Sequence, residues 1–269
     1  MNAEQKYFFD LNGFTVVRGV FSAEEIAAAN KVIDGKMDQV KVRKGLLRNT
    51  VQGTLMAGDG KTGRMDLGGI LEWGDESAFF RSVLSHPKLI PYFHALLGKG
   101  YRMDHLPFVL AQEKGSEGFA LHGGMVDVTS GKYSPHTSYH CVNGELSNTL
   151  LACSVALVDH NPGDGGYCVV RGSHKSNFPA PASFINGDSH HEFLHTPNAK
   201  AGDVILFSEA TVHGALPWNG DHQRRVALYR FASATCTYGR SYFAQVGRRT
   251  HFTRLNSLKH AFYFILFYS

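Results

Sequence analysis

Short β-prone runs fill the sequence from about residue 101 to residue 232, and they constrain the fold more than any other feature. Runs of this length, separated by Gly, Pro, Asn and Asp, are typical of β-sandwiches and barrels. The runs are Leu106–Gln112, Phe119–His122, Thr149–Val158, Tyr167–Val170, Phe193–Thr196, Asp203–Phe207, Val212–Leu216 and Val226–Phe231. We therefore expect a mainly β core with flanking helices, an α+β fold whose strands form a two-sheet jelly roll.

The first hundred residues read as mostly helical. Gly13–Val20 is a short β-rich run, and it is followed by Ser22 and, three residues later, Glu25. This pair is a capping box, so it predicts the start of a helix. A second helical stretch is expected over 77–97, interrupted by prolines, whereas 40–75 is rich in Gly, Lys, Arg and Asp and reads as a loop.

The chain of 269 residues is within the range of a single large all-β or mixed domain. We expect one domain over 1–269, with a mostly helical part over 1–100, a jelly-roll core over 101–232 and a C-terminal tail over 233–269. The longest apolar run, Ala261–Tyr268, is far shorter than the roughly 20 residues that span a bilayer. We therefore expect no membrane span.

Charge and cysteine content exclude several functional classes. Lys and Arg number 27 against 23 Asp and Glu, and like charges do not occur in long blocks, so a nucleic-acid partner is not expected. The four cysteines have no C-x-x-C spacing and are too few for a disulfide scaffold. Because the N-terminus also lacks the pattern of a secretory leader, we expect free thiols and a cytoplasmic location.

Histidines are abundant, at fifteen against four cysteines. Imidazole without thiolate is a ligand set for Fe, Cu, Ni or Zn in sites that also use oxygen ligands. His122 ends a predicted strand and precedes two glycines, while His213 opens another strand after a turn. Either histidine alone reads as structural. Two imidazoles on different strands of one barrel can nevertheless meet at one metal, so both are candidate ligands.

Two arginines open the last β run. Arg224 and Arg225 follow His213 by eleven and twelve residues. Arginine pairs bidentately with a carboxylate, and a buried arginine needs an anion to balance its charge. The pair is therefore a candidate anion-binding site, and the alternative is a solvated strand start.

Taken in order, these motifs resemble the phytanoyl-CoA dioxygenase family of non-haem Fe(II), 2-oxoglutarate-dependent oxygenases. Residues 13–26 are similar to the opening strand and helix of the family. Residues 164–175 are similar to its glycine turn and its Pro-Gly-Ser-His-Lys signature, with Arg171 where Pro is usual. The strand 201–207 then leads to His213, and an arginine follows at the usual distance.

The resemblance implies a double-stranded β-helix, a cupin-like jelly roll, that holds Fe(II) through a His-x-Asp pair and a distal histidine. This facial triad leaves three metal positions for 2-oxoglutarate and O2. The mapping makes His122 the proximal ligand and His213 the distal ligand. Arg224 becomes the partner of the distal 2-oxoglutarate carboxylate, with Arg225 as second choice. His174, in the family signature, is expected to be structural.

The family pattern breaks at Gly124, which stands where the carboxylate ligand is expected. In one interpretation another carboxylate substitutes. Glu209 is favoured if a tight turn brings it back to His213, and Asp127 is the other candidate. In a second interpretation a halide or water takes the position, as in the related non-haem iron halogenases. In a third, the protein is a non-catalytic jelly-roll binding protein.

The expected function is a 2-oxoglutarate-dependent dioxygenase that uses O2 to hydroxylate a small or medium organic substrate. The segment between the strands that bear the predicted site carries aromatic and imidazole side chains. Tyr133, His136, Tyr139 and His140 are the candidates for lining the open mouth of the site.

Overall fold

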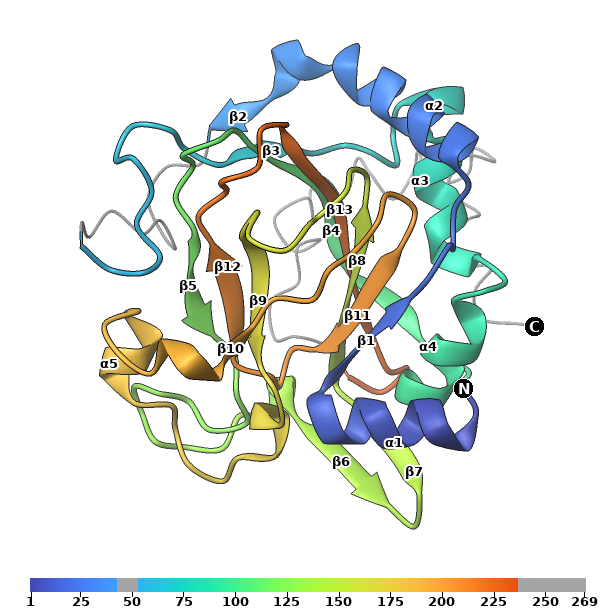
Figure 1. Ribbon diagram of the computed structural model, residues 1–269. Coiled ribbons are helices and arrows are strands. Elements are labelled where there is room, and N and C mark those ends of the chain that lie inside the picture. The colour runs from blue at the N-terminus through green and yellow to red at the C-terminus, as the bar shows by residue number, and fades with distance from the viewer. Residues whose placement is uncertain (43–52, 237–269) are drawn as a thin grey trace, which may run out of the picture.

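The computed structural model describes residues 1–42 and 53–236. Within them, two antiparallel β-sheets face each other and enclose the interior of the protein (Figure 1). The strand order is β1-β11-β8-β13-β4-β3-β2 in the large sheet and β10-β9-β12-β5 in the small sheet. The mainly β fold with flanking helices that the sequence predicts is therefore confirmed.

Each predicted β run contains a strand, and the ends differ by a few residues. The large sheet consists of β1 (Phe14–Val17), β2 (Lys41–Val42), β3 (Met65–Leu67), β4 (Arg102–Gln112), β8 (Leu150–Ala156), β11 (Val204–Ser208) and β13 (Arg224–Ala232). The small sheet consists of β5 (Phe119–His122), β9 (Gly166–Val170), β10 (Leu194–His195) and β12 (His213–Leu216).

A separate hairpin, β6 (Tyr139–Val142) and β7 (Glu145–Asn148), was not predicted from the sequence. Its strands are short and mostly polar, so they carry little β signal. The turn between them is Asn143–Gly144, and both residues have positive φ, 53° and 79°. Asn-Gly in this conformation is the favoured two-residue hairpin turn, so this dipeptide is the signal that could have found it.

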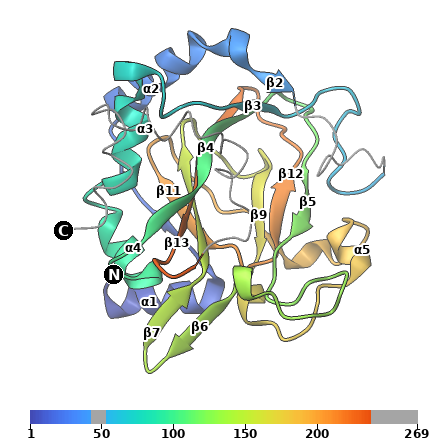
Figure 2. The same cartoon turned by 180° about the vertical axis from the view of Figure 1, so that it is seen from behind.

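The helices cover the outer face of the large sheet, as the two opposite views show (Figures 1 and 2). They are α1 (Ala3–Asn12), α2 (Ala23–Asp34), α3 (Ala78–Ser82) and α4 (Ile90–Leu97), whereas the short α5 (Ala182–Ile185) lies beside the small sheet. The predicted capping box is present, because the Ser22 side chain accepts from the Glu25 amide and Glu25 accepts from the Ser22 amide. No described helix is long and apolar enough to cross a bilayer.

Alternation along the strands separates two hydrophobic layers. On β8, Leu151, Cys153 and Val155 pack in the cluster that includes the helices, while Ala152 and Ala156 belong to the layer between the sheets. The same period of two on β13 sends Ala227, Tyr229 and Phe231 toward the helices. The alternate residues of β13 therefore face the space between the sheets.

Residues 237–269 lie outside the described part, and with them nearly all of the predicted C-terminal tail.

Candidate metal and cosubstrate site

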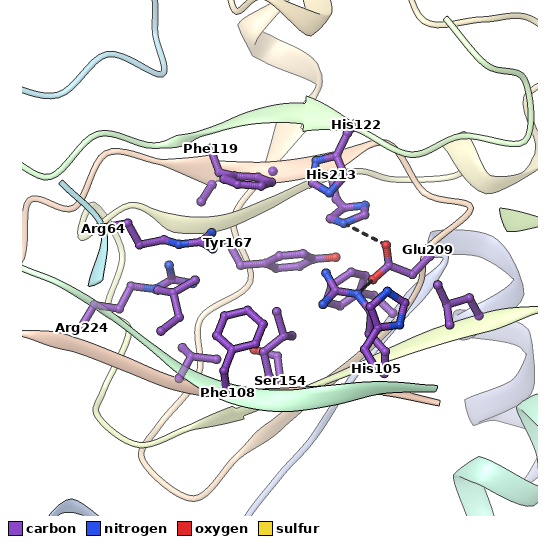
Figure 3. A pocket seen from close by; sticks show the side chains of 18 of the residues that line it. Arg64, His105, Phe108, Phe119, His122, Ser154, Tyr167, Glu209, His213 and Arg224 are labelled. Carbon is purple, nitrogen blue, oxygen red and sulfur yellow. Dashed lines mark hydrogen bonds and ion pairs between the residues drawn. The ribbon is translucent and has the colours of Figure 1, made fainter. Parts of the chain in front are cut away.

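A cavity of about 410 Å³ lies between the two sheets (Figure 3). Its walls come from β5, β9 and β12 on one side and from β4, β8, β11 and β13 on the other. Most of the lining is aliphatic or aromatic, and the charged and imidazole groups stand out against it. A cavity of this size that combines apolar walls with convergent polar groups is the usual form of a small-molecule site.

Three predicted residues meet in this cavity. His122 on β5 and His213 on β12 are opposite each other in the antiparallel register, and their ring centroids are 4.2 Å apart. Glu209, in the turn before β12, brings its Oε2 to 3.6 Å from His213 Nε2. One ligand atom from each of the three residues lies within 4.8 Å of the others. The group therefore has the composition and spacing of a 2-His-1-carboxylate metal site.

Backbone contacts set the orientation of both imidazoles. His122 Nδ1 is 3.0 Å from the Ala120 carbonyl oxygen, and His213 Nδ1 is 2.8 Å from the Thr211 carbonyl oxygen. A carbonyl only accepts, so each Nδ1 carries the proton and each Nε2 keeps its lone pair. Burial lowers the pKa of His122 to about 3 and also lowers the pKa of His213. Both rings are neutral at physiological pH, as metal ligands must be.

A tight turn places Glu209 beside His213. The Ser208 carbonyl accepts from the Thr211 amide at 3.0 Å and from the Thr211 hydroxyl at 2.7 Å, which closes the turn between β11 and β12. Burial on its own would raise the pKa of Glu209, but the adjacent Arg230 and the two histidines lower it to about 2. The carboxylate is therefore ionised inside the cavity.

Arg230 on β13 is the partner that keeps Glu209 ionised, and sequence reasoning missed it. Its Nε is 2.7 Å from Glu209 Oε1, which leaves Oε2 as the oxygen that faces His213. Arg224, Val226, Leu228 and Arg230 alternate along β13 and all line the cavity. This period of two was the available signal, because it places Arg230 on the same face as the predicted Arg224.

At the family position of the carboxylate, Gly124, the backbone conformation disfavours a side chain, although a Cβ there would lie 3.6 Å from its nearest neighbours. Gly123 and Gly124 have φ of 91° and 95°, a region that L side chains rarely adopt. A Cβ at Gly123 would lie 2.2 Å from the Thr211 carbonyl oxygen. Asp127 does not join the cluster, because its carboxylate accepts from the Thr129 and Ser130 amides in an exposed turn.

Arg224 lies in the same cavity with an unbalanced charge. Its Nη1 donates to Gln112 Oε1, and Gln112 in turn donates through Nε2 to the Glu117 carbonyl at 2.9 Å. The Nε of Arg224 has no partner, and Arg224 forms no ion pair with a carboxylate in the described part of the chain. Burial lowers the pKa of Arg224 to about 10, so the group remains charged at neutral pH and requires an anion.

The neighbouring glycine makes room for this arginine. A Cβ on Gly166 would lie 2.8 Å from Arg224 Nε, so any larger residue would fill the space that the guanidinium uses. Arg225 faces the other side of the sheet, where its Nη2 is 2.7 Å from Asp34 Oδ1 and its Nη1 is 3.2 Å from Asn30 Oδ1. Of the two predicted arginines, the structure places Arg224 in the cavity and Arg225 outside it.

The family profile described as Phytanoyl-CoA dioxygenase (PhyH) matches residues 9–226. The chain belongs to the phytanoyl-CoA dioxygenase family. The family and the enzyme class predicted from the sequence are thereby confirmed. The match spans both the helical first third and the jelly-roll core, so it covers every residue of the cavity described above except those at the end of β13. No curated protein sequence matches the chain.

Solved structures share this fold at low sequence identity. HygX from Streptomyces hygroscopicus, with nickel, 2-oxoglutarate and hygromycin B bound, is 21% identical over 90% of this chain and 92% of its own, with a TM-score of 0.69. The epimerase SnoN from nogalamycin biosynthesis is 20% identical over 89% and 87%, with a TM-score of 0.59. EctD from S. alaskensis, with 2-oxoglutarate and 5-hydroxyectoine, is 19% identical over 87% and 76%, with a TM-score of 0.60.

A second arginine that the sequence did not single out lines the cavity of this family member. Arg64, just before β3, pairs with Asp66 at 2.9 Å, and its guanidinium carbon lies 4.9 Å from the centroid of the Phe119 ring. It comes from the segment that the sequence predicted as a loop. That segment is rich in Lys and Arg, so no local pattern distinguishes this side chain from its neighbours.

The predicted mouth residues do not line the described cavity, so that expectation is wrong. Tyr139 instead packs against α1, where its hydroxyl donates to Asp10. Tyr133 and His140 contact each other on the exposed hairpin side, with 3.0 Å between Oη and Nε2. The segment folds away from the cavity because Tyr139 is buried against the N-terminal helix. His174 is also buried there, 2.9 Å from the Asp10 carbonyl oxygen, as expected for a structural residue.

Proposed function

We propose that the protein is a non-haem Fe(II)- and 2-oxoglutarate-dependent dioxygenase that hydroxylates a small or medium organic substrate with O2. The observation that carries the proposal is that one cavity contains two groups. The first is the cluster of His122, Glu209 and His213, and the second is Arg224, whose charge has no carboxylate partner among the described residues. A metal-ligand set and an anion-binding group in a single apolar cavity are the two features that this chemistry requires.

The three side chains fit Fe(II). The imidazoles are neutral with Nε2 available, and Glu209 is ionised with one oxygen facing the histidines. His122 Nε2, His213 Nε2 and Glu209 Oε2 would hold the metal, which leaves positions for 2-oxoglutarate and O2. When bound, Fe(II) and 2-oxoglutarate supply the oxygen-activating chemistry, and the protein supplies their placement.

Arg224 fits the distal carboxylate of 2-oxoglutarate. Arg224 lines the cavity with no carboxylate partner among the described residues, and a carboxylate is the best geometric match for a guanidinium. Gln112 holds one edge of the guanidinium, because its own amide is fixed by the Glu117 carbonyl. The cross-strand pairing of Arg224 with Gln112 therefore holds the guanidinium in place at the cavity wall.

Glu209 supports the dioxygenase interpretation over the alternatives. A carboxylate beside both histidines supplies the oxygen ligand that Gly124 lacks, so no vacant position is needed for a halide. The complete donor set also favours a metal-dependent enzyme over a non-catalytic binding protein. Arg230 supports the ligand role of Glu209, because it occupies Oε1 and leaves Oε2 for a metal.

A small-molecule substrate fits the size of the cavity. About 410 Å³ must hold 2-oxoglutarate and part of a substrate, so the substrate is bound partly at the opening. The structures similar in fold contain hygromycin B and 5-hydroxyectoine, which supports a small organic molecule as the substrate class.

We further propose a single oxygenase domain and a cytoplasmic location. The family match from residue 9 to residue 226 supports one domain, since it spans the helical part and the core. Four free cysteines, of which Cys153 and Cys168 are buried, support a reducing compartment.

The test is an anaerobic titration of the metal-free protein with Fe(II) and 2-oxoglutarate. We expect a weak visible charge-transfer band, because the metal and the cosubstrate meet at one site. The Glu209→Ala variant should bind Fe(II) about tenfold or more weakly, since it lacks the only carboxylate of the ligand set. Glu76→Ala, which removes a surface carboxylate paired with Lys36, is the matched control and should titrate as the wild type does.

Two results would contradict the proposal. Absence of the band at saturating Fe(II) and 2-oxoglutarate would exclude both oxygenase and halogenase chemistry. Unchanged Fe(II) affinity in Glu209→Ala would remove Glu209 from the ligand set. A band that shifts with chloride would then favour the halogenase alternative.

A further inference from the structure

Tyr167 on β9 carries a hydroxyl that the site described so far does not use. The side chain lies between the sheets, 7% exposed, with its ring 4.5 Å from the Phe207 ring and 6.2 Å from the His213 ring between centroids. The hydroxyl oxygen is buried and makes no hydrogen bond of good geometry within the described residues, although the Thr211 hydroxyl lies close to it. Figure 3 shows it directed toward the side of the cavity that holds His213 and Glu209, with Arg224 at the other end.

Other buried tyrosines of the protein satisfy their hydroxyls. Tyr229 donates to the Phe80 carbonyl at 2.9 Å, Tyr101 donates to the Leu84 carbonyl at 3.0 Å, and Tyr139 donates to Asp10. A buried hydroxyl without a partner destabilises the folded state, and such groups are rare in native proteins. Packing does not explain the hydroxyl of Tyr167, because phenylalanine would make the same ring contact with Phe207.

The groups around Tyr167 offer its hydroxyl no well-placed acceptor, because the neighbouring Thr211 hydroxyl makes its own hydrogen bond to the Ser208 carbonyl at 2.7 Å. Burial raises the pKa of the phenol well above its usual range, so the hydroxyl keeps its proton. Glu209, the nearest carboxylate in the cavity, is already engaged by Arg230 at Oε1 and faces His213 with Oε2. An oxygen of a molecule bound in the cavity would give the hydroxyl a better acceptor than these neighbours do, and an anionic oxygen gives the strongest bond.

We propose that Tyr167 donates a hydrogen bond to the keto-acid end of bound 2-oxoglutarate. The inference rests on the proposed function and extends it by one contact. Arg224 takes the distal carboxylate, so the opposite end of the molecule extends toward the two histidines. The Tyr167 hydroxyl lies on that side of the cavity. The two residues thus bind opposite ends of the cosubstrate, and Tyr167 also fixes which way the keto acid is turned.

The test compares Tyr167→Phe with Tyr229→Phe, which removes a satisfied buried hydroxyl on the face of β13 that packs against the helices rather than lining the cavity. Three quantities are measured for each variant: the midpoint of thermal unfolding without metal, the Kd of 2-oxoglutarate with Fe(II) under anaerobic conditions, and the position of the charge-transfer band. For Tyr167→Phe we expect an unfolding midpoint no lower than that of the wild type, since the variant loses an orphaned polar atom.

The same variant should bind 2-oxoglutarate about tenfold or more weakly, because a hydrogen bond to a charged acceptor is lost. Its charge-transfer band should shift, because the contact is to the end of the molecule that binds the metal. Tyr229→Phe should lower the unfolding midpoint and leave the Kd and the band unchanged. A merely structural role for Tyr167 would give the Tyr229→Phe pattern at both positions.

Three outcomes separate the hypotheses. A Tyr167→Phe variant with the wild-type Kd and band overturns the inference. A weaker Kd with an unmoved band places the contact on the distal carboxylate and overturns the assignment to the keto-acid end. If the wild type shows no band at all, the proposed function itself is contradicted. Failure of the proposed function is therefore distinguishable from failure of the Tyr167 contact.

Discussion

At the scale of single residues, the unusual feature is a buried carboxylate that has an arginine at one oxygen and two neutral imidazoles facing the other. Burial disfavours the ionised form of Glu209 and on its own would raise the pKa, yet Arg230 and the histidines lower this pKa to about 2. Pairing with Arg230 makes the buried charge tolerable without metal. The same pairing leaves one oxygen toward the histidines, so the side chain is positioned for a metal before any metal arrives.

Replacing Arg230 by Met should therefore destabilise the metal-free protein by about 3–5 kcal/mol at pH 7, because it leaves Glu209 unpaired in the cavity. The folded pKa of Glu209 lies below its ordinary 4.5, so its contribution to stability is present above about pH 4.5 and is lost as the pH falls toward 2. Urea unfolding at pH 7 and between pH 5 and pH 3 measures both effects, and in Arg230→Met the loss of the Glu209 contribution with falling pH should weaken or reverse, because burial on its own raises the pKa of Glu209.

Arg225→Met is the matched control for that variant. Arg225 is also on β13 and also pairs with a carboxylate, but its partner, Asp34 of α2, has a side chain that is 61% exposed. Exposed pairs contribute about 0–1 kcal/mol, so the control should change the free energy of unfolding by less than about 1 kcal/mol. Equal losses in the two variants would show that the cavity pair has no special role.

At the scale of strands and turns, the sequence was informative where the hydrophobic pattern and the turn residues agreed. β5 was predicted with its observed bounds, Phe119–His122, because glycines follow it directly. The helix predicted to start after Ser22 ends at Asp34, where Gly35 follows and a 3₁₀ turn begins at Met37. Local patterns thus locate elements, while their ends depend on packing.

The pairing of β12 with β5 is the element that brings the two histidines together. Gly214 follows His213, and a Cβ there would lie 2.5 Å from the Phe119 carbonyl oxygen. Because backbone cannot yield as a side chain does, Gly214→Ala should push β12 away from β5, cost about 1–3 kcal/mol of stability and weaken Fe(II) binding. Gly68→Ala, where nothing lies within 4 Å of the added carbon, is the control.

Chemical denaturation and an anaerobic Fe(II) titration measure the two effects of Gly214→Ala. The prediction requires both to change together, since the same displacement separates His122 from His213. If Gly214→Ala is as stable as Gly68→Ala and binds Fe(II) as the wild type does, the strand pair adapts to the extra carbon and the prediction is wrong.

At the scale of the whole molecule, the candidate site draws on segments that no local pattern connects. His122, His213 and Arg224 could be assigned because the order of motifs along the chain resembled a family. Glu209 followed from the turn before His213. Arg230, Arg64 and Tyr167 could not be found in this way, because their roles arise from contacts across strands or between the sheets. Sequence reasoning therefore located the ligands better than the residues that hold them.

Buried histidines should also make the whole fold sensitive to mild acid. Burial lowers the pKa of His160 to about 3 and that of His174 to about 4, whereas an unfolded histidine titrates near 6.5. Between pH 6.5 and pH 5 the unfolded chain thus binds more protons than the folded one, so stability present above pH 6.5 is lost as the pH falls. Each such histidine adds a slope of up to about 1.4 kcal/mol per pH unit.

Urea unfolding of the metal-free protein across this range measures the slope, before most carboxylates begin to protonate. His160→Phe tests its origin, because His160 packs beside Trp218 with centroids 5.5 Å apart, outside the metal cluster. In this variant the free energy of unfolding should change less steeply with pH than in the wild type, by up to about 1.4 kcal/mol per pH unit. Its affinity for Fe(II) should equal that of the wild type. A stability that stays constant from pH 7 to pH 5 would mean that the buried histidines accept protons without unfolding the core.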